Sequence, residues 1–399
     1  ELVRSESSLT ESRDLRRRDP RRSAARRSRS VASADVSDGI RSGLIGSGMM
    51  GGEHIRNIAL LDNACVGAIY EPDAGMAAAA KALAPDVVFV ASEAELIGFP
   101  NLDAILVVSP NHCHAAQLEA ISAARPDIAI LVEKPLFTDP KDAKRIDALR
   151  QSHEAPIWVA MEYRYMPPIA ALLEKLESAT GGVKMLTIRE HRFPFLSKVG
   201  DWNRFNQNTG GTLVEKCCHF FDLMRVALGR DPVRVMASAG QAVNHLEECY
   251  DGEVPDIWDS GYVIVEFANG VRAMLELCMF AEGARYQEEI SAVGPDGKIE
   301  VFVPGPGRFW PEHLGAPPIA RLVESPRSPM GPVEHEIPVD PALLSAGDHN
   351  GSTFYQHQKF QQVVLQGAAP EVSLTDGIWA VRMGQAAQVS ALENRMVEL

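Results

Sequence analysis

Residues 40–51 read Ile40-Arg41-Ser42-Gly43-Leu44-Ile45-Gly46-Ser47-Gly48-Met49-Met50-Gly51, an apolar run followed at once by the spacing G-x-G-x-x-G and a helical pattern. This spacing between a strand and a helix is typical of a dinucleotide-binding turn. Gly46 permits the tight turn, Gly48 lets the backbone approach a pyrophosphate, and Gly51 lets the helix pack on the strand. Because amide groups at the helix N-terminus attract phosphate, we expect residues 46–51 to bind the cofactor. The alternative is that these glycines serve only a turn.

Glu71 lies 20 residues beyond Gly51, at the end of the second predicted strand. A carboxylate at this place accepts hydrogen bonds from the ribose hydroxyls of a dinucleotide. The segment from Glu71 to Ala80 contains no Arg or Lys that would attract a 2′-phosphate. The sequence therefore favours NAD over NADP as the cofactor.

Outward from this turn, short apolar runs alternate with helical patterns through residue 162. Strands are expected at 40–45, 65–70, 87–90, 104–109, 128–132 and 157–161, with helices at 76–84, 114–124 and 141–152 between them. Such alternation predicts right-handed crossovers and a parallel sheet covered on both faces. We therefore expect an α/β fold whose first domain, residues 39–162, is a Rossmann-type doubly wound sheet.

The pattern changes beyond residue 162. Helices are expected at 168–178, 212–228, 353–366 and 375–392, and strands at 183–193, 233–239, 262–267, 271–277, 288–293 and 298–303. Asn269-Gly270 and Asp296-Gly297 have hairpin chemistry, since both dipeptides tolerate positive φ. Ten of the 26 prolines fall between Pro304 and Pro341, which predicts a long irregular loop. Residues 163–399 are thus expected to form an α+β domain with a mainly antiparallel sheet.

Composition narrows the possible functions. The chain has 399 residues, 46% of them hydrophobic and 23% charged, which is ordinary for a globular protein. Its 53 acidic and 39 basic side chains give a net charge of −14, which disfavours binding to nucleic acid or a membrane surface. No apolar run approaches the roughly 18 residues that a transmembrane helix needs. Six scattered cysteines predict reduced thiols and a cytoplasmic location.

Residues 1–38 differ from the rest of the chain. They hold ten Arg, seven acidic residues and nine Ser, without helical or strand periodicity. We expect this leader to be disordered. Its Arg and Ser bias also resembles an organelle transit peptide, which would move the expected location to an organelle, although the seven acids argue against it.

Two segments with chemically active side chains follow predicted strands of the first domain, at the edge where parallel sheets bind ligands. They are Ser109-Pro110-Asn111-His112-Cys113-His114 and Glu133-Lys134-Pro135. A lysine beside a nicotinamide would supply a fixed positive charge and a donor to a substrate hydroxyl, although a Glu-Lys pair is often merely solvated. We expect cofactor contacts from Ser109, Asn111, His114, Glu133 and Lys134. A metal held by His112 and His114 is the weakest interpretation, because no Asp or His stands at a matching strand end.

A third segment reads Glu215-Lys216-Cys217-Cys218-His219-Phe220-Phe221-Asp222. On one continuous helix, the i, i+4 spacing places Glu215 and His219 on the same face. The carboxylate would then orient the imidazole as a general base. The alternative is a core histidine with a carboxylate partner. Cys217 and Cys218 are more typical of packing residues than of a redox pair.

Together these motifs resemble the Gfo/Idh/MocA oxidoreductase family over about residues 39–399. The motifs that carry the resemblance are Gly46–Gly51, Pro110-Asn111-x-x-His114, Glu133-Lys134-Pro135, and Gly210-Gly211 followed by Glu215-x-x-x-His219-x-x-Asp222. The resemblance implies a pyranose or cyclitol substrate bound between the two domains and a homodimer or homotetramer. It assigns the catalytic lysine to Lys134 and the catalytic histidine to His219. Glu215 and Cys217 depart from the Asp and Gly usual in the family, which implies a reshaped pocket.

The substrate contacts are expected in the loop between the strand at 183–193 and Gly210. Its aromatic and polar side chains suit the apolar faces and hydroxyls of a polyol; the expected contacts are Arg192, Trp202, Arg204 and Asn206, together with Glu215 and His219. An equally open alternative is a loop that only covers the second sheet.

These features predict an NAD-dependent dehydrogenase of a sugar or inositol-like polyol that contains no metal. His219 would take the hydroxyl proton, Lys134 would stabilise the developing alkoxide, and Glu215 would hold the imidazole in the useful tautomer. Two alternatives remain open: a dinucleotide-sensing regulator without turnover, and an NAD-dependent glycoside hydrolase.

Overall fold

The computed structural model describes residues 39–399. The disordered or targeting leader expected at residues 1–38 lies outside the described residues. No helix in the described part of the chain is long and apolar enough to cross a membrane.

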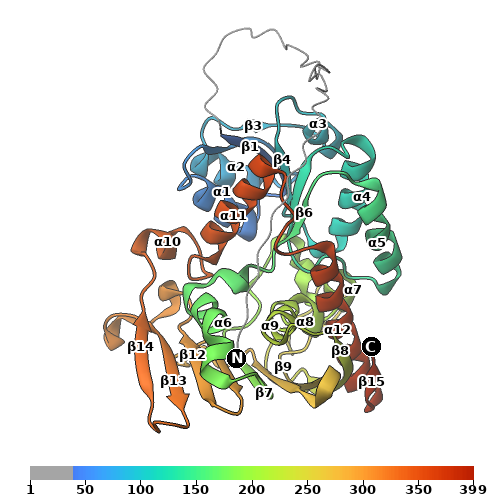
Figure 1. Ribbon diagram of the computed structural model, residues 1–399. Helices are drawn as coiled ribbons and strands as arrows, with labels where there is room; N and C mark the ends of the chain where they lie inside the picture. The colour runs from blue at the N-terminus through green and yellow to red at the C-terminus, as the bar shows by residue number, and fades with distance from the viewer. Residues whose placement is uncertain (1–38) are drawn as a thin grey trace, which may run out of the picture. The chain divides into compact units, whose positions relative to one another are not determined.

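The first sheet, at the top of Figure 1, has parallel strands. Its six strands have the order β3-β2-β1-β4-β5-β6, which confirms the predicted Rossmann architecture. The strands are β1 Ile40–Ile45, β2 Ala64–Tyr70, β3 Val88–Phe89, β4 Ala104–Val107, β5 Ala129–Val132 and β6 Ile157–Val159. The helices between them are α1 Met49–Ile58, α2 Ala74–Leu83, α3 Glu93–Ile97, α4 His114–Ala124 and α5 Ala143–Ser152. Every residue of β4 and β5 is buried, because helices cover both faces of a parallel sheet.

The second sheet has nine strands in the order β14-β13-β12-β11-β7-β10-β9-β8-β15. They are β7 Met185–His191, β8 Pro232–Gly240, β9 Ser260–Phe267, β10 Arg272–Cys278, β11 Glu288–Val293, β12 Gly297–Val303, β13 Ala320–Pro326, β14 Val333–Ile337 and β15 Val397–Glu398. All neighbours are antiparallel except β7 and β10, which confirms the mainly antiparallel sheet.

One prediction for this sheet was wrong. The proline-rich stretch expected to be one irregular loop contains strands β13 and β14. In β13 buried and partly exposed residues alternate over Ala320–Val323, and the strand pairs with β12. Pro329 and Pro332 fall in the turn between β13 and β14, where a missing amide proton costs no ladder bond.

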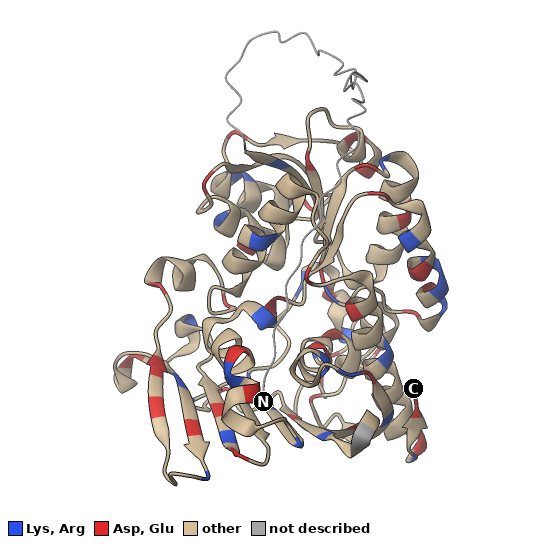
Figure 2. Ribbon diagram, in the orientation of Figure 1, with Lys and Arg blue, Asp and Glu red and all other residues tan. Residues whose placement is uncertain are grey.

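Some helices of the C-terminal half pack on the inner face of the second sheet, whereas α10 and α11 contact α1. The helices of this half are α6 Pro167–Thr180, α7 Asn206–Thr209, α8 Thr212–Glu215, α9 Cys218–Leu228, α10 Pro341–Ala346, α11 Ser352–Gln366 and α12 Leu374–Glu393. The inward residues of the strands form a second core with α6, α9 and α12. Figure 2 shows basic and acidic residues interspersed along the surface helices. One such pair is Arg150 with Asp147 on α5, and both side chains are exposed.

The C-terminal part of the chain returns to the first sheet. Helix α11 lies beside α1 (Figure 1), and Phe360 and Val363 on α11 belong to the core of the first sheet. The ring of Phe360 packs edge-on against Trp158 of β6. Val372 and Val381 extend the same core. The first sheet is therefore completed by residues from the far end of the sequence.

Candidate active site

A cavity of about 410 Å³ lies at the carboxyl edge of the first sheet. The β1–α1 turn, the ends of β2, β4 and β5, and a loop of the C-terminal half contribute its walls. The structure brings together these predicted residues around it: Gly46, Gly48, Met49, Met50, Glu71, Ser109, Asn111, Glu133, Lys134, Trp202 and Glu215. The cavity therefore joins the expected dinucleotide residues to two of the expected substrate residues.

The glycine turn has the shape that a pyrophosphate site requires. Gly46 has φ +93°, and a Cβ there would lie 2.7 Å from the carbonyl oxygen of Val108, so only glycine fits. At Gly48 the space is open, since a Cβ on this residue would meet nothing within 4 Å. Helix α1 begins directly after it, and among residues 39–399 no side chain caps its first amides. These amides are free to bind an anion.

Glu71 is held by the same turn. Its Oε2 accepts hydrogen bonds from the backbone N–H of Ser47 at 2.6 Å and from the Ser47 hydroxyl at 3.1 Å. Its Oε1 accepts the backbone N–H of Asp73 at 2.9 Å. The two lysines that line the cavity are Lys134, which follows β5, and Lys198 in the C-terminal half. Strands β1 and β4 lie between the strand of Glu71 and that of Lys134.

His114 does not line the cavity, contrary to expectation. It is buried, with Nδ1 2.8 Å from the carbonyl oxygen of Pro135 and Nε2 3.0 Å from that of Ser109. The imidazole therefore joins the loop after β4 to the loop after β5. Of the described residues, the group with metal-ligand spacing contains neither His112 nor His114.

Glu133 lies in the cavity wall, but its carboxylate is turned into the protein. Oε1 lies 2.9 Å from Nε2 of His54, and Oε2 accepts the backbone N–H of Lys134 at 3.2 Å. Burial lowers the pKa of His54, but the hydrogen bond and charge of Glu133 outweigh it, and the net pKa is raised. Glu133 thus positions the backbone at Lys134.

Lys134 is a partly buried cation. Its Nζ donates to the backbone carbonyl of Glu215 at 3.3 Å. Burial lowers its pKa, but the nearby Cys218, Glu215 and Glu133 outweigh burial, so the pKa of Lys134 is raised. The ammonium therefore stays charged at the end of the cavity nearest the C-terminal half.

The helix expected at residues 212–228 is broken, and this overturns the role predicted for Glu215. Helix α8 ends at Glu215, and α9 begins at Cys218. The carbonyl of Glu215 accepts from Lys134 and from the Cys218 thiol at 3.4 Å. Among residues 39–399, no hydrogen bond or ion pair joins the Glu215 carboxylate to His219; its Oε1 lies 3.8 Å from Nζ of Lys198. The i, i+4 geometry fails because the helix is not continuous.

His219 is instead held by an aromatic ring. It is 2% exposed, and its imidazole stacks on Tyr163 with ring centroids 4.0 Å apart and planes 8° apart. Burial lowers the pKa of His219 well below its usual value, and the cations Lys134, Lys216, His349 and Arg192 lower it further. The imidazole is therefore neutral at neutral pH and able to accept a proton.

Tyr163 belongs to a buried polar cluster that the sequence pattern did not reveal. Its hydroxyl lies 2.6 Å from Nζ of Lys216, and that Nζ lies 2.8 Å from Oε1 of Glu190. Glu190 of β7 stands opposite Glu288 of β11 in the antiparallel register. In β7 and β11 buried residues alternate with more exposed ones, and both glutamates occupy buried positions of this pattern. This position in the pattern is the one sequence signal that marks them.

Of the four substrate residues predicted in the loop after β7, one lines the cavity and three do not. Trp202 lines the cavity, and Nζ of Lys198, which was not predicted, lies 4.6 Å from the centroid of its indole ring. Arg192 stacks on Phe193 outside this cavity. Arg204 and Asn206 do not contact the cavity, contrary to the prediction, because the loop turns them toward the second sheet. Arg204 is buried, with Nε 2.9 Å from Glu248, and Asn206 forms hydrogen bonds with Asp256.

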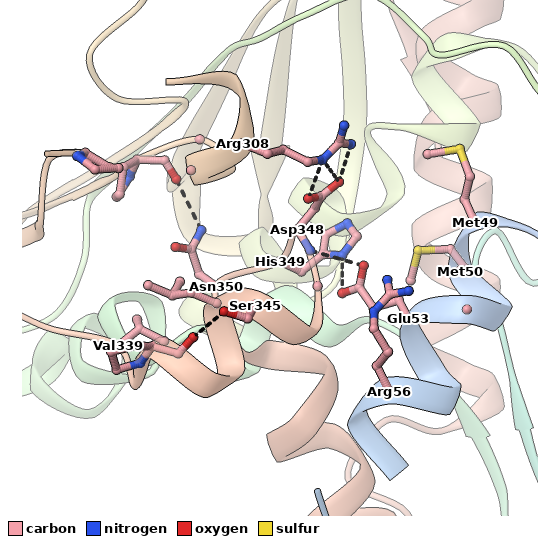
Figure 3. Close-up of a pocket in the computed structure, with 18 of the residues that line it drawn as sticks. Met49, Met50, Glu53, Arg56, Arg308, Val339, Ser345, Asp348, His349 and Asn350 are labelled. Atoms are coloured by element: carbon pink, nitrogen blue, oxygen red, sulfur yellow. Dashed lines mark hydrogen bonds and ion pairs between the residues drawn. The ribbon is translucent and has the colours of Figure 1, made fainter. Parts of the chain in front are cut away.

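A second cavity of about 990 Å³ lies between helices α1 and α2 and residues 304–350. Figure 3 shows Met49, Met50 and Glu53 of α1 on one side, facing Asp348 and His349. Its walls are mainly apolar. It shares Gly48, Met49 and Met50 with the first cavity.

A buried charged group lies at one end of this second cavity. Nδ1 of His349 lies 2.8 Å from Oε1 of Glu53 and 3.6 Å from Oε1 of Glu162, and the Thr353 hydroxyl donates to Glu53 at 2.9 Å. Burial alone would raise the pKa of Glu53, but His349 lowers it to about 2. Burial alone would lower the pKa of His349, but Glu53 and Glu162 raise it to about 9. The three ligand atoms lie within 4.8 Å of one another, a spacing that a metal ion could bridge, but Nδ1 of the protonated imidazole holds a proton toward Glu53 and has no lone pair to offer a metal.

Comparisons with known proteins agree with this geometry. The family model described as "Oxidoreductase family, NAD-binding Rossmann fold" matches residues 40–161, and "Oxidoreductase family, C-terminal alpha/beta domain" matches residues 176–399. Myo-inositol 2-dehydrogenase of Thermotoga maritima is 24% identical over 308 residues, 76% of this chain and 82% of the relative. D-xylose 1-dehydrogenase [NADP(+)] of Haloarcula marismortui is 28% identical over 203 residues, 50% of this chain and 53% of the relative. The crystal structure of a probable dehydrogenase from Thermotoga maritima is 25% identical, with a TM-score of 0.70 over 90% of this chain and 98% of that one.

Proposed function

The chain belongs to the Gfo/Idh/MocA family of oxidoreductases, and from this membership we propose that it is an NAD-dependent dehydrogenase of an inositol-like or sugar polyol. The observation that carries the proposal is one cavity lined by both the glycine turn and Lys134. His219 is buried outside the residues that line this cavity, and the charge of Lys134 helps to lower its pKa.

The residues of the cavity fit a dinucleotide. The open space at Gly48 and the uncapped start of α1 suit a pyrophosphate, and Glu71 at the end of β2 suits the ribose hydroxyls. Bound NAD would supply a nicotinamide ring that accepts hydride from a carbinol carbon. We propose NAD rather than NADP, because Glu71 carries a negative charge where a 2′-phosphate would lie.

Lys134 and His219 supply the groups that the oxidation of an alcohol needs. The Lys134 ammonium stabilises negative charge on the substrate oxygen as its proton leaves. His219 accepts that proton as a general base, since burial and four nearby cations keep it neutral.

Glu215 and Trp202 are the proposed contacts to the rest of the substrate. Oε2 of Glu215 is buried without a hydrogen-bond partner among the described residues, and it is free to accept a substrate hydroxyl. The face of Trp202, flanked by Lys198, suits the apolar face of a polyol ring.

We place the boundary between a cofactor domain, residues 39–162, and a substrate domain, residues 163–399, in the connection between β6 and α6. We also propose that copies associate through the outer face of the second sheet. Tyr262 and Ile264 on β9 and Met236 on β8 form adjacent exposed positions there, with 57%, 43% and 50% of their surface accessible.

The test measures NADH formation by near-ultraviolet absorbance with the purified chain, NAD and a panel of inositols and aldoses. Growth of NADH with one substrate supports the dehydrogenase and ranks the panel in the same experiment. Binding of NAD by calorimetry without NADH formation from any polyol would contradict the proposal and favour a sensor or a hydrolase that recycles its cofactor. The His219→Gln variant is the matched control for background reduction.

A further inference from the structure

We propose that Tyr163 is the positioning residue of His219, and that Lys216 and Glu190 hold Tyr163 in place from inside the second sheet. The proposal rests on the function proposed above, in which His219 accepts the substrate proton. It assigns to an aromatic ring the task that a carboxylate usually performs for a catalytic histidine.

The first step is the contact between the two rings. Tyr163 lies in the short 3-10 helix η3, Glu162–Tyr165, which connects the two sheets, whereas His219 lies in the first turn of α9. Their planes are 8° from parallel at a centroid separation of 4.0 Å. Such face-to-face contact restrains the plane and tilt of the imidazole through its faces. Nδ1 of His219 is buried and has no hydrogen-bond partner among the described residues, so the Tyr163 face provides the defined restraint.

The second step is the anchor of Tyr163 itself. The ring is buried, and its hydroxyl pairs with Nζ of Lys216 at 2.6 Å. Lys216 sits at the break between α8 and α9, three residues before His219. Its Nζ also lies 2.8 Å from Glu190, which is fully buried on β7. Lys216 therefore connects Glu190 of the second sheet to the hydroxyl of Tyr163.

The break in the helix is what makes this arrangement possible. In a continuous helix the side chains at positions 215 and 219 would share a face. With the break, Glu215 turns toward Lys198 and the cavity, while Lys216 turns toward Tyr163. The imidazole of His219 therefore contacts the ring of Tyr163 through one face, and no carboxylate among the described residues bonds to its Nδ1.

The charges around His219 come from every element packed on it. Lys134 follows β5, Arg192 follows β7, Lys216 precedes α9 and His349 precedes α11, and each lowers the pKa of His219. Behind Lys216 stand Glu190 and Glu288, and burial beside Glu190 raises the pKa of Glu288 to about 7. Glu288 is therefore largely protonated at the pH where His219 titrates, and removal of the Lys216 charge acts on His219 mainly by taking away one cation. The loss of this cation favours the imidazolium, so the pKa of His219 is expected to rise.

The experiment follows the protonation of His219 by NMR in the full chain with histidine rings labelled with ¹³C, the signal being assigned by its loss in His219→Gln. In Lys216→Met the midpoint is expected to move upward by roughly one pH unit relative to the parent, as for loss of a neighbouring charge. Lys216→Arg, which keeps the charge, is the matched control and is expected to stay near the parent. An unchanged midpoint in a folded Lys216→Met chain would overturn the electrostatic part of the proposal.

The positioning part is tested by kinetics with the polyol that the parent oxidises. Tyr163→Leu is expected to lower kcat by roughly 10²-fold, as for a misplaced catalytic group, with little change in KM or NAD affinity. Tyr163→Phe keeps the ring face and loses only the hydroxyl, so it is expected to retain most of kcat. Equal kcat in the parent and Tyr163→Leu would overturn the role of the stack. If the parent oxidises no polyol, the proposed function fails, while the NMR midpoints still decide how Lys216 acts on His219.

Discussion

Nζ of Lys134 lies 3.3 Å from the backbone carbonyl oxygen of Glu215. This hydrogen bond joins the loop that follows β5 to the last residue of α8, so a cation of the first sheet is held by a backbone group of the second half. The carbonyl that Lys134 uses is free because the helix stops there. The position of the Lys134 ammonium and the break between α8 and α9 therefore stabilise each other.

Replacement of Lys134 by Met is expected to lower kcat by roughly 10²–10³-fold, the cost of losing one donor to a developing oxyanion. NAD affinity measured by calorimetry is expected to stay within a few-fold of the parent, because the proposed pyrophosphate contacts lie at the start of α1. Lys198→Met, in the same cavity, is the control. A larger loss of kcat in Lys198→Met than in Lys134→Met would reverse the assignment.

Replacement of Glu71 by Ala is expected to weaken NAD binding by roughly 5–30-fold, the equivalent of one or two charge-assisted hydrogen bonds. The same change also loosens Ser47, whose amide and hydroxyl both bond to this carboxylate. Calorimetric titration with NAD and NADP measures both effects. Glu95→Ala on α3 serves as a carboxylate control, and an NAD affinity for Glu71→Ala equal to that of this control would exclude Glu71 from the site.

The pair of Arg164 with Asp222 is expected to contribute to stability. Nε of Arg164 lies 2.6 Å from Asp222, whose carboxylate is fully buried. Asp222→Asn removes the closer of the two carboxylates that pair with Arg164, the other being Asp376 at 3.5 Å, and is expected to cost about 1–3 kcal/mol in the free energy of unfolding. Urea denaturation measures it, with Asp147→Asn as the control, since the exposed Asp147–Arg150 pair contributes about 0–1 kcal/mol. Equal losses in the two variants would contradict the expectation.

The pH dependence of stability is expected to follow His349 and Glu53. The folded pKa of His349 is raised from 6.5 to about 9, so its contribution is complete below pH 6.5 and is lost as the pH rises toward 9. The folded pKa of Glu53 is lowered from 4.5 to about 2, so its contribution is present above pH 4.5 and is lost as the pH falls toward 2.

Between pH 6.5 and 9 the parent should therefore lose more unfolding free energy than His349→Gln, which removes the titrating group. Urea melts across this range measure the difference. His335→Gln, on the edge strand β14, is the control histidine and is expected to follow the parent. Parallel slopes for the parent and His349→Gln would show that the ion pair does not form.

Features that depend on neighbouring residues could be predicted from the sequence. The glycine turn, the parallel order of strands and the place of Glu71 follow from spacing and strand ends, and the structure has all three. The antiparallel sheet followed from alternation and from the hairpin dipeptides.

Features that depend on distant partners could not be predicted. The break after Glu215 is accompanied by a hydrogen bond from Lys134, which lies 81 residues away in the chain. The stack on His219 comes from Tyr163 in the connection between the sheets, a residue without any local motif. Arg204 and Asn206 have the residue types of a polyol site, but side-chain type does not indicate the direction in which a loop turns.

Residues of α11 and of the first half of α12 pack in the core of the first sheet. This packing has a consequence for the synthesis of the chain. Strand β6 ends at Val159, but the core around it is completed by Phe360 and Val381. At roughly 5–20 residues per second, the ribosome takes on the order of 10–40 s to make the chain between them. During that time the apolar side chains that contact Phe360 and Val381 in the finished protein, Trp158 among them, lack these partners, so the nascent Rossmann sheet is expected to reach its full stability only after the last helices are made.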